Sequence, residues 1–216
     1  SGRLADVNAR IEAGGNGIAK EGTKIGAQMA VAATGETKYA YELGSICAQQ
    51  AKCVGANYAF APVVDIDFNF RNPITNTRTY GSDPDTVLAM GRAYLNGCQG
   101  NGVAVSIKHF PGDGVDERDQ HLLTSVNSLS CEEWDATYGK IYKTLIEDGA
   151  KTVMVGHIMQ PAYSRALCPG IKDRDILPAS LSKVLLCGLL REKLGFNGLI
   201  ISDATTMTGM TAAMPR

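Results

Sequence analysis

The hydrophobic pattern of this chain switches repeatedly between the period of a strand and the period of a helix, and this alternation constrains the fold most. Short runs of apolar and β-branched residues predict strands at 4–11, 58–64, 103–107, 152–155 and 199–202. Apolar residues at helical spacing predict helices at 38–54, 84–98, 131–148 and 180–194. Strands that alternate with helices build a parallel sheet, so the sequence predicts an α/β protein.

Two helix starts carry clear local signals. Asp83-Pro84 places a capping side chain directly before a proline that suits the first helical position. The run from Ser130 to Glu133 has the spacing of a capping box, in which the two side chains cap each other's backbone N–H groups. These signals fix where the helices at 84 and 131 begin.

Side chains capable of chemistry follow the ends of all five predicted strands: Glu12, Asp65, Lys108-His109, His157 and Asp203. A doubly wound sheet and a (β/α)8 barrel both fit the alternating pattern, but functional groups from several strand ends favour the barrel. Five strands cannot close a barrel that needs eight, so we expect a TIM (β/α)8 barrel that is incomplete in this chain. The glycine turn at 14–17 lacks the Rossmann spacing, which argues against a dinucleotide cofactor.

The composition excludes several classes of partner. The 216 residues carry a net charge of −1 and are 44% hydrophobic, which predicts one soluble domain without a nucleic-acid or membrane partner. Six cysteines without CxxC pairs predict reduced thiols and hence a cytoplasmic protein. Three histidines without partner cysteines at metal-binding spacing predict neither a metal site nor any other cofactor.

The segment 108–121 is the densest group of titratable side chains in the chain. Histidine as a residue type ordinarily titrates near pH 6.5, so an imidazole at position 121 is a suitable group to donate and accept a proton near neutral pH. Asp119, two residues earlier, can hold the other ring nitrogen. Asp203 ends an apolar strand and could serve as a carboxylate nucleophile, or instead as the N-cap of a following helix.

Five motifs in order resemble glycoside hydrolases of family 3, in the β-N-acetylglucosaminidase branch. The pattern Lys-His-Phe-Pro-Gly-x-Gly-x₄-Asp-x-His at 108–121 is similar to the family signature. The other four motifs lie at 60–65 (FAPVVD), 78–84 (RTYGSDP), 154–157 (MVGH) and 196–203 (FNGLIISD). The resemblance implies that residues 1–216 form a single, partial N-terminal TIM-barrel domain of that family, with strands two to six of the barrel.

The resemblance also implies an activity and a set of site residues. It predicts a retaining β-N-acetylhexosaminidase-like glycosidase that removes terminal β-linked N-acetylglucosamine, such as that of cell-wall fragments in a bacterial cytoplasm. Asp203 would form the covalent glycosyl-enzyme, and His121, held by Asp119, would act as acid and base. The expected substrate-binding residues are Lys108, His109, Arg78, Asp65 and His157, with Asp65 either binding the sugar or orienting Arg78.

Two departures from the family pattern leave alternatives open. Asp113 and Arg10 stand where the family usually has a histidine and a sugar-binding aspartate, so the sugar specificity is not fixed. A histidine acid/base would also admit phosphate as the acceptor, because it would not repel an incoming dianion as a carboxylate would. The alternatives are therefore a glycoside phosphorylase or an inactive sugar-binding fragment. A homo-oligomer or a second chain could supply the missing strands.

Overall fold

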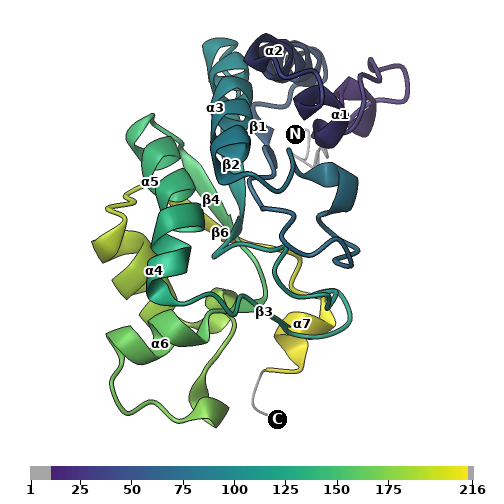
Figure 1. Cartoon of the computed structure of the whole chain (residues 1–216). Helices are drawn as coiled ribbons and strands as arrows, with labels where there is room; N and C mark the ends of the chain where they lie inside the picture. Colours follow the sequence, from purple (N-terminus) through teal and green to yellow (C-terminus); the bar gives the residue numbers. More distant parts are fainter. Residues whose placement is uncertain (1–10, 214–216) are drawn as a thin grey trace.

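The computed structural model describes residues 11–213, which form a parallel sheet covered by helices (Figure 1). Its four strands lie in chain order and pair in parallel: β1 (Tyr58–Ala59), β2 (Ala104–Phe110), β4 (Thr152–Val155) and β6 (Leu199–Ser202). A separate parallel pair joins β3 (Ser125–Val126) to β5 (Ile158–Met159). Residues 4–10 of the first predicted strand lie outside the described residues. The α/β class and the partial barrel are confirmed.

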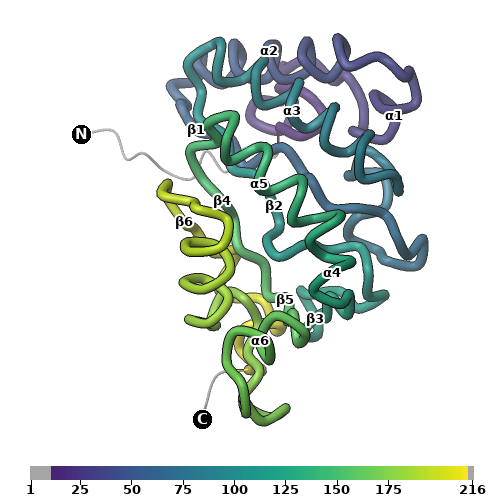
Figure 2. The backbone as a smooth tube through the Cα atoms, turned by 60° about the vertical axis from the view of Figure 1, so that its left-hand side comes forward, coloured from purple at the N-terminus to yellow at the C-terminus, as the bar shows by residue number. Residues whose placement is uncertain are grey.

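The long helices lie close to their predicted positions. α2 (Thr37–Cys53), α3 (Pro84–Gly100) and α5 (Lys140–Glu147) lie side by side along one face of the sheet (Figures 1 and 2). The remaining α-helices are short: α1 (Gln28–Ala32), α4 (Cys131–Trp134), α6 (Pro161–Leu167) and α7 (Thr208–Thr211). Two π-helical stretches are η3 (Asp135–Gly139), which joins α4 to α5, and η6 (Val184–Lys193). Single 3₁₀ turns form η1 (Gly15–Gly17), η2 (Asn76–Arg78), η4 (Asp173–Asp175) and η5 (Ala179–Leu181).

Two glycines let α2 and α3 approach each other. A β-carbon on Gly44 would lie 2.3 Å from the carbonyl oxygen of Tyr94, and one on Gly97 would lie 2.2 Å from that of Tyr41. Only a residue without a side chain fits at these two positions. α3 also contacts β2, and the buried residues of both helices belong to one hydrophobic core.

An aromatic cluster fixes the carboxyl end of β2 against the helices. Phe110 packs edge-on against Trp134 and Tyr142, with ring centroids 6.2 and 5.3 Å away. The indole N–H of Trp134 donates a 2.7 Å hydrogen bond to the carbonyl of Pro111, so α4 holds the loop that leaves β2. This loop carries the 108–121 segment, and its start is therefore anchored in the core.

The outer strand β6 differs from the central strand β4 in burial. All four residues of β4 are buried, whereas Leu199 in β6 is 57% exposed and Ile200 and Ile201 are half-buried. Within residues 11–213, β6 has a neighbouring strand on one side only. Its outer edge is the place where further barrel strands would pair.

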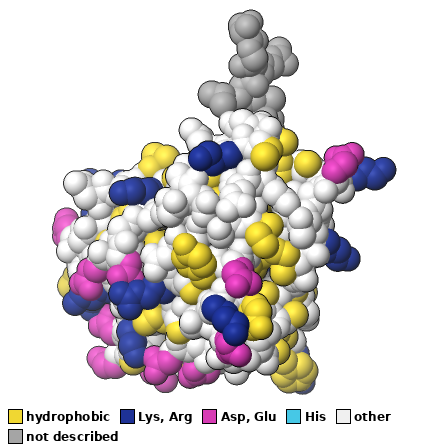
Figure 3. Space-filling model, turned by 90° about the horizontal axis from the view of Figure 1, so that it is seen from above, with side chains coloured by type: hydrophobic (Ala, Val, Ile, Leu, Met, Phe, Trp, Pro, Cys, Tyr) yellow, Lys and Arg dark blue, Asp and Glu magenta, His cyan; other side chains and the backbone are white. Residues whose placement is uncertain are grey.

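On the face above α1 and α2, the described residues carry charges of both signs (Figure 3). Basic and acidic side chains are intermixed there with hydrophobic ones (Figure 3). Among the described residues, none of the helices has both the length and the apolar character needed to span a membrane.

Candidate active site

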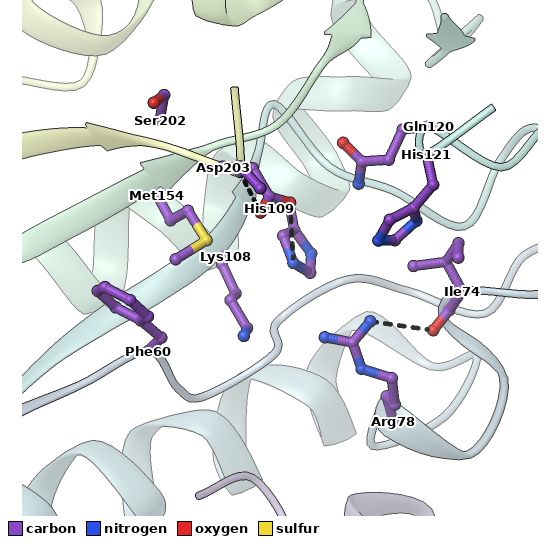
Figure 4. Close-up of a pocket in the computed structure, with 11 residues that line it drawn as sticks. Phe60, Ile74, Arg78, Lys108, His109, Gln120, His121, Met154, Ser202 and Asp203 are labelled. Carbon is purple, nitrogen blue, oxygen red and sulfur yellow. Dashed lines mark hydrogen bonds and ion pairs between the residues drawn. The ribbon is translucent and has the colours of Figure 1, made fainter. Parts of the chain in front are cut away.

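A cavity of about 350 Å³ lies at the carboxyl ends of the strands (Figure 4). Five of the eight predicted site residues line it: Arg78, Lys108, His109, His121 and Asp203. The other lining residues are Phe60, Ile74, Gln120, Met154, Ser202 and Ala204. Parallel strands bring their carboxyl ends to one edge, and this geometry gathers side chains that are far apart in the sequence.

A bulge at the end of β2 turns two consecutive side chains into the cavity. The pairing of β2 with β4 changes register between Ile107 and Phe110, and Lys108 and His109 lie within that irregularity. The peptide bond between them is cis. Successive residues of a regular strand face opposite sides, so a bulge is needed for both to line one cavity.

Glu12 holds the two cationic side chains of the cavity. Its Oε1 lies 2.6 Å from Nζ of Lys108, and its two oxygens accept hydrogen bonds of 2.9 Å from Nη2 and Nε of Arg78. Burial would raise the Glu12 pKa, but Arg78 and Lys108 outweigh it and hold that pKa far below its ordinary value. The pKa of Lys108 is lowered, since burial and the charge of Arg78 outweigh the attraction of Glu12.

Asp65 orients the His109 ring from behind. Its Oδ2 lies 2.7 Å from Nδ1 of His109, and its Oδ1 accepts the backbone N–H groups of His109 at 3.0 Å and Asp113 at 2.8 Å. Burial raises the Asp65 pKa, yet His109 and these hydrogen bonds leave it below the ordinary value. A carboxylate on that side makes Nδ1 the donor, which leaves Nε2 of His109 facing the cavity.

Asp203 continues the β6 ladder and presents its carboxylate to the cavity. Its backbone N–H donates to the Val155 carbonyl at 2.9 Å, and its side chain is 22% exposed. Oδ1 accepts the Ala204 N–H at 2.8 Å, and Oδ2 lies 3.9 Å from Nε2 of His109. Burial raises the pKa of Asp203, but His109, the Ala204 N–H and Lys108 together lower it by more. The pKa is therefore below its ordinary value, which favours an ionised carboxylate. The next helix, α7, begins at Thr208, so Asp203 is not its N-cap.

His121 enters the cavity from the loop after β2, and its ring points inward (Figure 4). Oδ1 of Asp119 lies 2.7 Å from Nδ1 of His121 and accepts its backbone N–H at 2.8 Å. The His121 side chain is 46% exposed, so Nε2 remains available to a molecule in the cavity. Backbone N–H groups of α7 donate to the loop, from Thr208 to the His121 carbonyl and from Gly209 to that of Gln120, both at 3.1 Å.

Two predicted substrate-binding residues lie behind the cavity instead of lining it. His157 is fully buried, with Nδ1 2.8 Å from Oγ of Ser180 and Nε2 3.0 Å from the carbonyl of Ala204. Asp65 is also fully buried, and it contacts His109 while Glu12 orients Arg78. Both side chains are bonded to protein groups, so in this arrangement they position the residues that line the cavity.

The sequence interpretation missed the apolar wall and one amide of the cavity. Phe60 and Met154 lie within or next to predicted strands, and Ile74 lies in the loop before Arg78. Gln120 stands between Asp119 and His121 in the signature, a position that the pattern leaves unassigned. Among the residues described, no three His, Cys, Asp or Glu side chains come together as a candidate metal site.

Comparison with known proteins agrees with this arrangement. The model of the "Glycosyl hydrolase family 3 N terminal domain" matches residues 6–215. A "Beta-N-acetylglucosaminidase/beta-glucosidase" of Cellulomonas fimi is 56% identical over 97% of this chain, which spans 37% of that relative.

Two solved structures extend the comparison. A structure described as "Beta-glucoside phosphorylase BglX bound to 2FGlc" has a TM-score of 0.94 and 52% identity, over 96% of this chain and 38% of that one. A family 3 β-N-acetylglucosaminidase from Paenibacillus sp. str. FPU-7 has a TM-score of 0.81 and 32% identity, over 88% of this chain and 34% of that one. The chain therefore spans less than half the length of these relatives. It belongs to glycosyl hydrolase family 3, within the N-terminal domain.

Proposed function

We propose that this chain carries the catalytic site of a retaining β-glycosidase. One observation carries the proposal: a carboxylate at the end of β6 shares a cavity with an imidazole that a second carboxylate holds. Retaining cleavage needs a nucleophile below the sugar and a group that donates and then accepts a proton. Asp203 has the lowered pKa that suits the first role, and Nε2 of His121, which has no partner among the described residues, suits the second.

The reaction would run in two steps on these atoms. In the first, the Asp203 carboxylate bonds to the anomeric carbon while Nε2 of His121 gives its proton to the departing glycosidic oxygen. In the second, water attacks the same carbon, its proton passes to Nε2 of His121, and the bond to Asp203 breaks. Asp119 would keep the His121 ring in orientation through both steps.

The cationic groups of the cavity suit a sugar rich in hydroxyl groups. Lys108, Arg78 and Nε2 of His109 all reach the cavity with hydrogen-bonding atoms. Phe60 and Met154 give it an apolar wall against which the less polar side of a sugar ring can pack. We infer a terminal β-linked N-acetylglucosamine as the substrate, in keeping with the names of two of the relatives.

A glycoside phosphorylase is the second candidate. The proton carrier in this cavity is an imidazole, which would not repel a phosphate dianion as a carboxylate would. One similar structure is described as a β-glucoside phosphorylase, which favours the same alternative and makes a β-glucoside the second sugar to test. In that case phosphate would replace water in the second step, and the product would be a sugar 1-phosphate.

Release of 4-nitrophenol from 4-nitrophenyl β-N-acetylglucosaminide and β-glucoside, with and without phosphate, tests both candidates. We expect turnover in the native chain and a loss of at least about 10³-fold in Asp203→Asn. Sugar 1-phosphate formation would favour the phosphorylase. Equal turnover in the two proteins would contradict the role of Asp203, and sugar binding without turnover would favour a non-catalytic binding protein.

A further inference from the structure

A buried carboxylate next to the cavity has no part in the reaction proposed above. Asp113 is 1% exposed and lies in the turn that follows β2. Its Oδ1 accepts hydrogen bonds of 2.8 Å from Nδ2 of Asn72 and from the backbone N–H of Gly114. Its Oδ2 accepts one of 3.1 Å from Nε2 of Gln120. Three donors therefore converge on this one side chain.

Backbone groups fix the direction of each amide that contacts Asp113. Oδ1 of Asn72 accepts the N–H groups of Ile74 at 2.8 Å and Thr75 at 2.9 Å, so its Nδ2 must face Asp113. Oε1 of Gln120 accepts the backbone N–H of His157 at 2.9 Å, so its Nε2 must face Asp113 as well. A backbone N–H can only donate, so a turned Asn72 would set its NH₂ group against two donors and a turned Gln120 would set its NH₂ group against one.

The Gln120 amide joins three segments that meet at the cavity. It belongs to the loop that carries His121, and it bonds to the turn after β2 through Asp113 and to the end of β4 through His157. The Gln120 side chain also lines the cavity beside His121 (Figure 4). Its orientation therefore sets how the loop sits against the ends of the two strands.

We propose that Asp113 is a positioning residue whose carboxylate, by accepting from Gln120, holds the His121 loop in place for proton transfer. The proposal rests on the proposed function only in giving His121 the role of acid and base. Asp113 contacts neither the cavity nor Asp203, so it acts through Gln120.

The environment of Asp113 favours a side chain that accepts hydrogen bonds on both sides. Burial and the nearby charge of Asp65 raise its pKa, while His109 and the hydrogen bonds from Gly114 and Asn72 oppose that rise. A neutral group would have to donate on one side, and every neighbour described above is already a donor. Only a carboxylate, whose two oxygens both accept, satisfies the donors of Asn72, Gly114 and Gln120.

The variant Asp113→Asn tests the proposal because it changes polarity with almost no change in volume. The NH₂ group of the new amide must face either the NH₂ group of Gln120 or the donors of Asn72 and Gly114. If Gln120 turns over to accept, its own NH₂ group opposes the His157 N–H. We expect faster hydrogen exchange of backbone amides in residues 117–124, and turnover lowered about tenfold or more for substrates whose leaving group needs protonation.

A double variant, D113N/Q120E, restores the pattern of donors and acceptors. The carboxylate moves to residue 120, where one oxygen accepts the His157 N–H and the other accepts the new amide at 113. The net charge equals that of the native chain. We expect the double variant to regain slow exchange and at least part of the turnover, which simple damage to the fold would not allow.

Leaving groups separate proton transfer from general loss of structure. A 2,4-dinitrophenyl glycoside departs with little help from an acid, so its first step should fall far less in D113N than that of a 4-methoxyphenyl glycoside. Glu117→Gln removes an exposed carboxylate from the same loop without touching Gln120 and serves as the matched control, with native exchange and turnover expected. If D113N does not fold, Gln120→Met removes the same link and should give the same exchange and leaving-group changes.

The exchange measurement keeps this inference distinct from the proposed function. If the native chain turns over no glycoside, the activity proposal fails. Hydrogen exchange of residues 117–124 then decides by itself whether Asp113 holds the loop. Native exchange rates in both D113N and Gln120→Met would overturn the proposal. A double variant no better than D113N in exchange would overturn it too.

Discussion

At the scale of single residues, Glu12 holds both Lys108 and Arg78 at the cavity. Arg78 and Lys108 both bind its carboxylate, and Lys108 is almost fully buried. Removing one partner of a buried pair leaves an uncompensated charge, which costs more than the pair itself contributes. The stability of the cavity and the orientation of its cations therefore depend on the same carboxylate.

We expect Glu12→Gln to lower the free energy of unfolding by roughly 3 kcal/mol at neutral pH, since Lys108 would lose its carboxylate partner. The folded pKa of Glu12 lies below its unfolded value of about 4.3, so its contribution is complete well above that pH and falls as the pH decreases. The native chain should lose stability between about pH 5 and pH 3 that the variant does not lose.

Urea unfolding at several pH values measures this difference. Glu147→Gln, at the exposed end of α5, is the control and should unfold like the native chain. A stability gap between Glu12→Gln and the native chain that stays constant down to pH 3 would contradict the assignment of an ionised, lowered-pKa carboxylate.

The sequence predicted the positions of the site residues better than their contacts. Strand ends and the signature spacing located Lys108, His109, His121 and Asp203, because a parallel sheet brings strand ends together. Which side chains face the cavity depends on the bulge in β2 and on partners such as Ser180, which are remote in sequence. That information is absent from local patterns, so the sequence alone does not show that Asp65 and His157 lie behind the cavity.

At the scale of elements, the helices with cap signals were predicted to within about two residues, as is usual for element ends. Oδ2 of Asp83 accepts the Thr86 N–H at 2.8 Å at the start of α3, and Ser130 and Glu133 form the predicted capping box at the start of α4. The short helices α1, α6 and α7 were missed, because helices of one or two turns offer too few residues to show a period.

Irregular elements escaped the sequence pattern for physical reasons. The predicted strand 58–64 forms a regular ladder only at Tyr58–Ala59. Beyond that point Pro62 has no N–H to donate, and the segment follows β2 through separate hydrogen bonds from Ser106, Lys108 and Val64. The π-helical stretches η3 and η6 add residues per turn within helices that the apolar period predicts as continuous.

The capping box gives an element-scale prediction. Ser130→Ala removes the side chain that accepts the Glu133 N–H, so we expect a loss of about 1 kcal/mol. For a chain of this size, that corresponds to a melting temperature lower by roughly 2–4 °C. Calorimetry of this variant beside Ser128→Ala, which lies before the helix, measures the effect. An unchanged melting temperature for Ser130→Ala would show that the box contributes nothing to stability.

At the scale of the whole molecule, the sheet of residues 11–213 ends at β6 with an incompletely covered strand. Leu199 is 57% exposed, and its outer edge presents backbone groups that no described strand pairs. Parallel barrel strands are normally buried on both faces, as β4 is here. The low net charge of −1 provides little repulsion between copies. These features favour association of the chain along this edge.

We therefore expect the isolated chain to self-associate, with a second copy covering β6, because its exposed edge and apolar side chains offer both hydrogen bonds and apolar area. Leu199→Lys places a charge at the strand and should shift sedimentation velocity profiles toward the monomer at equal concentration. Leu167→Lys, on α6 and 39% exposed, adds the same charge away from the edge and should leave association unchanged. A chain that stays monomeric across concentrations, or an equal effect of both lysines, would rule out β6 as the contact.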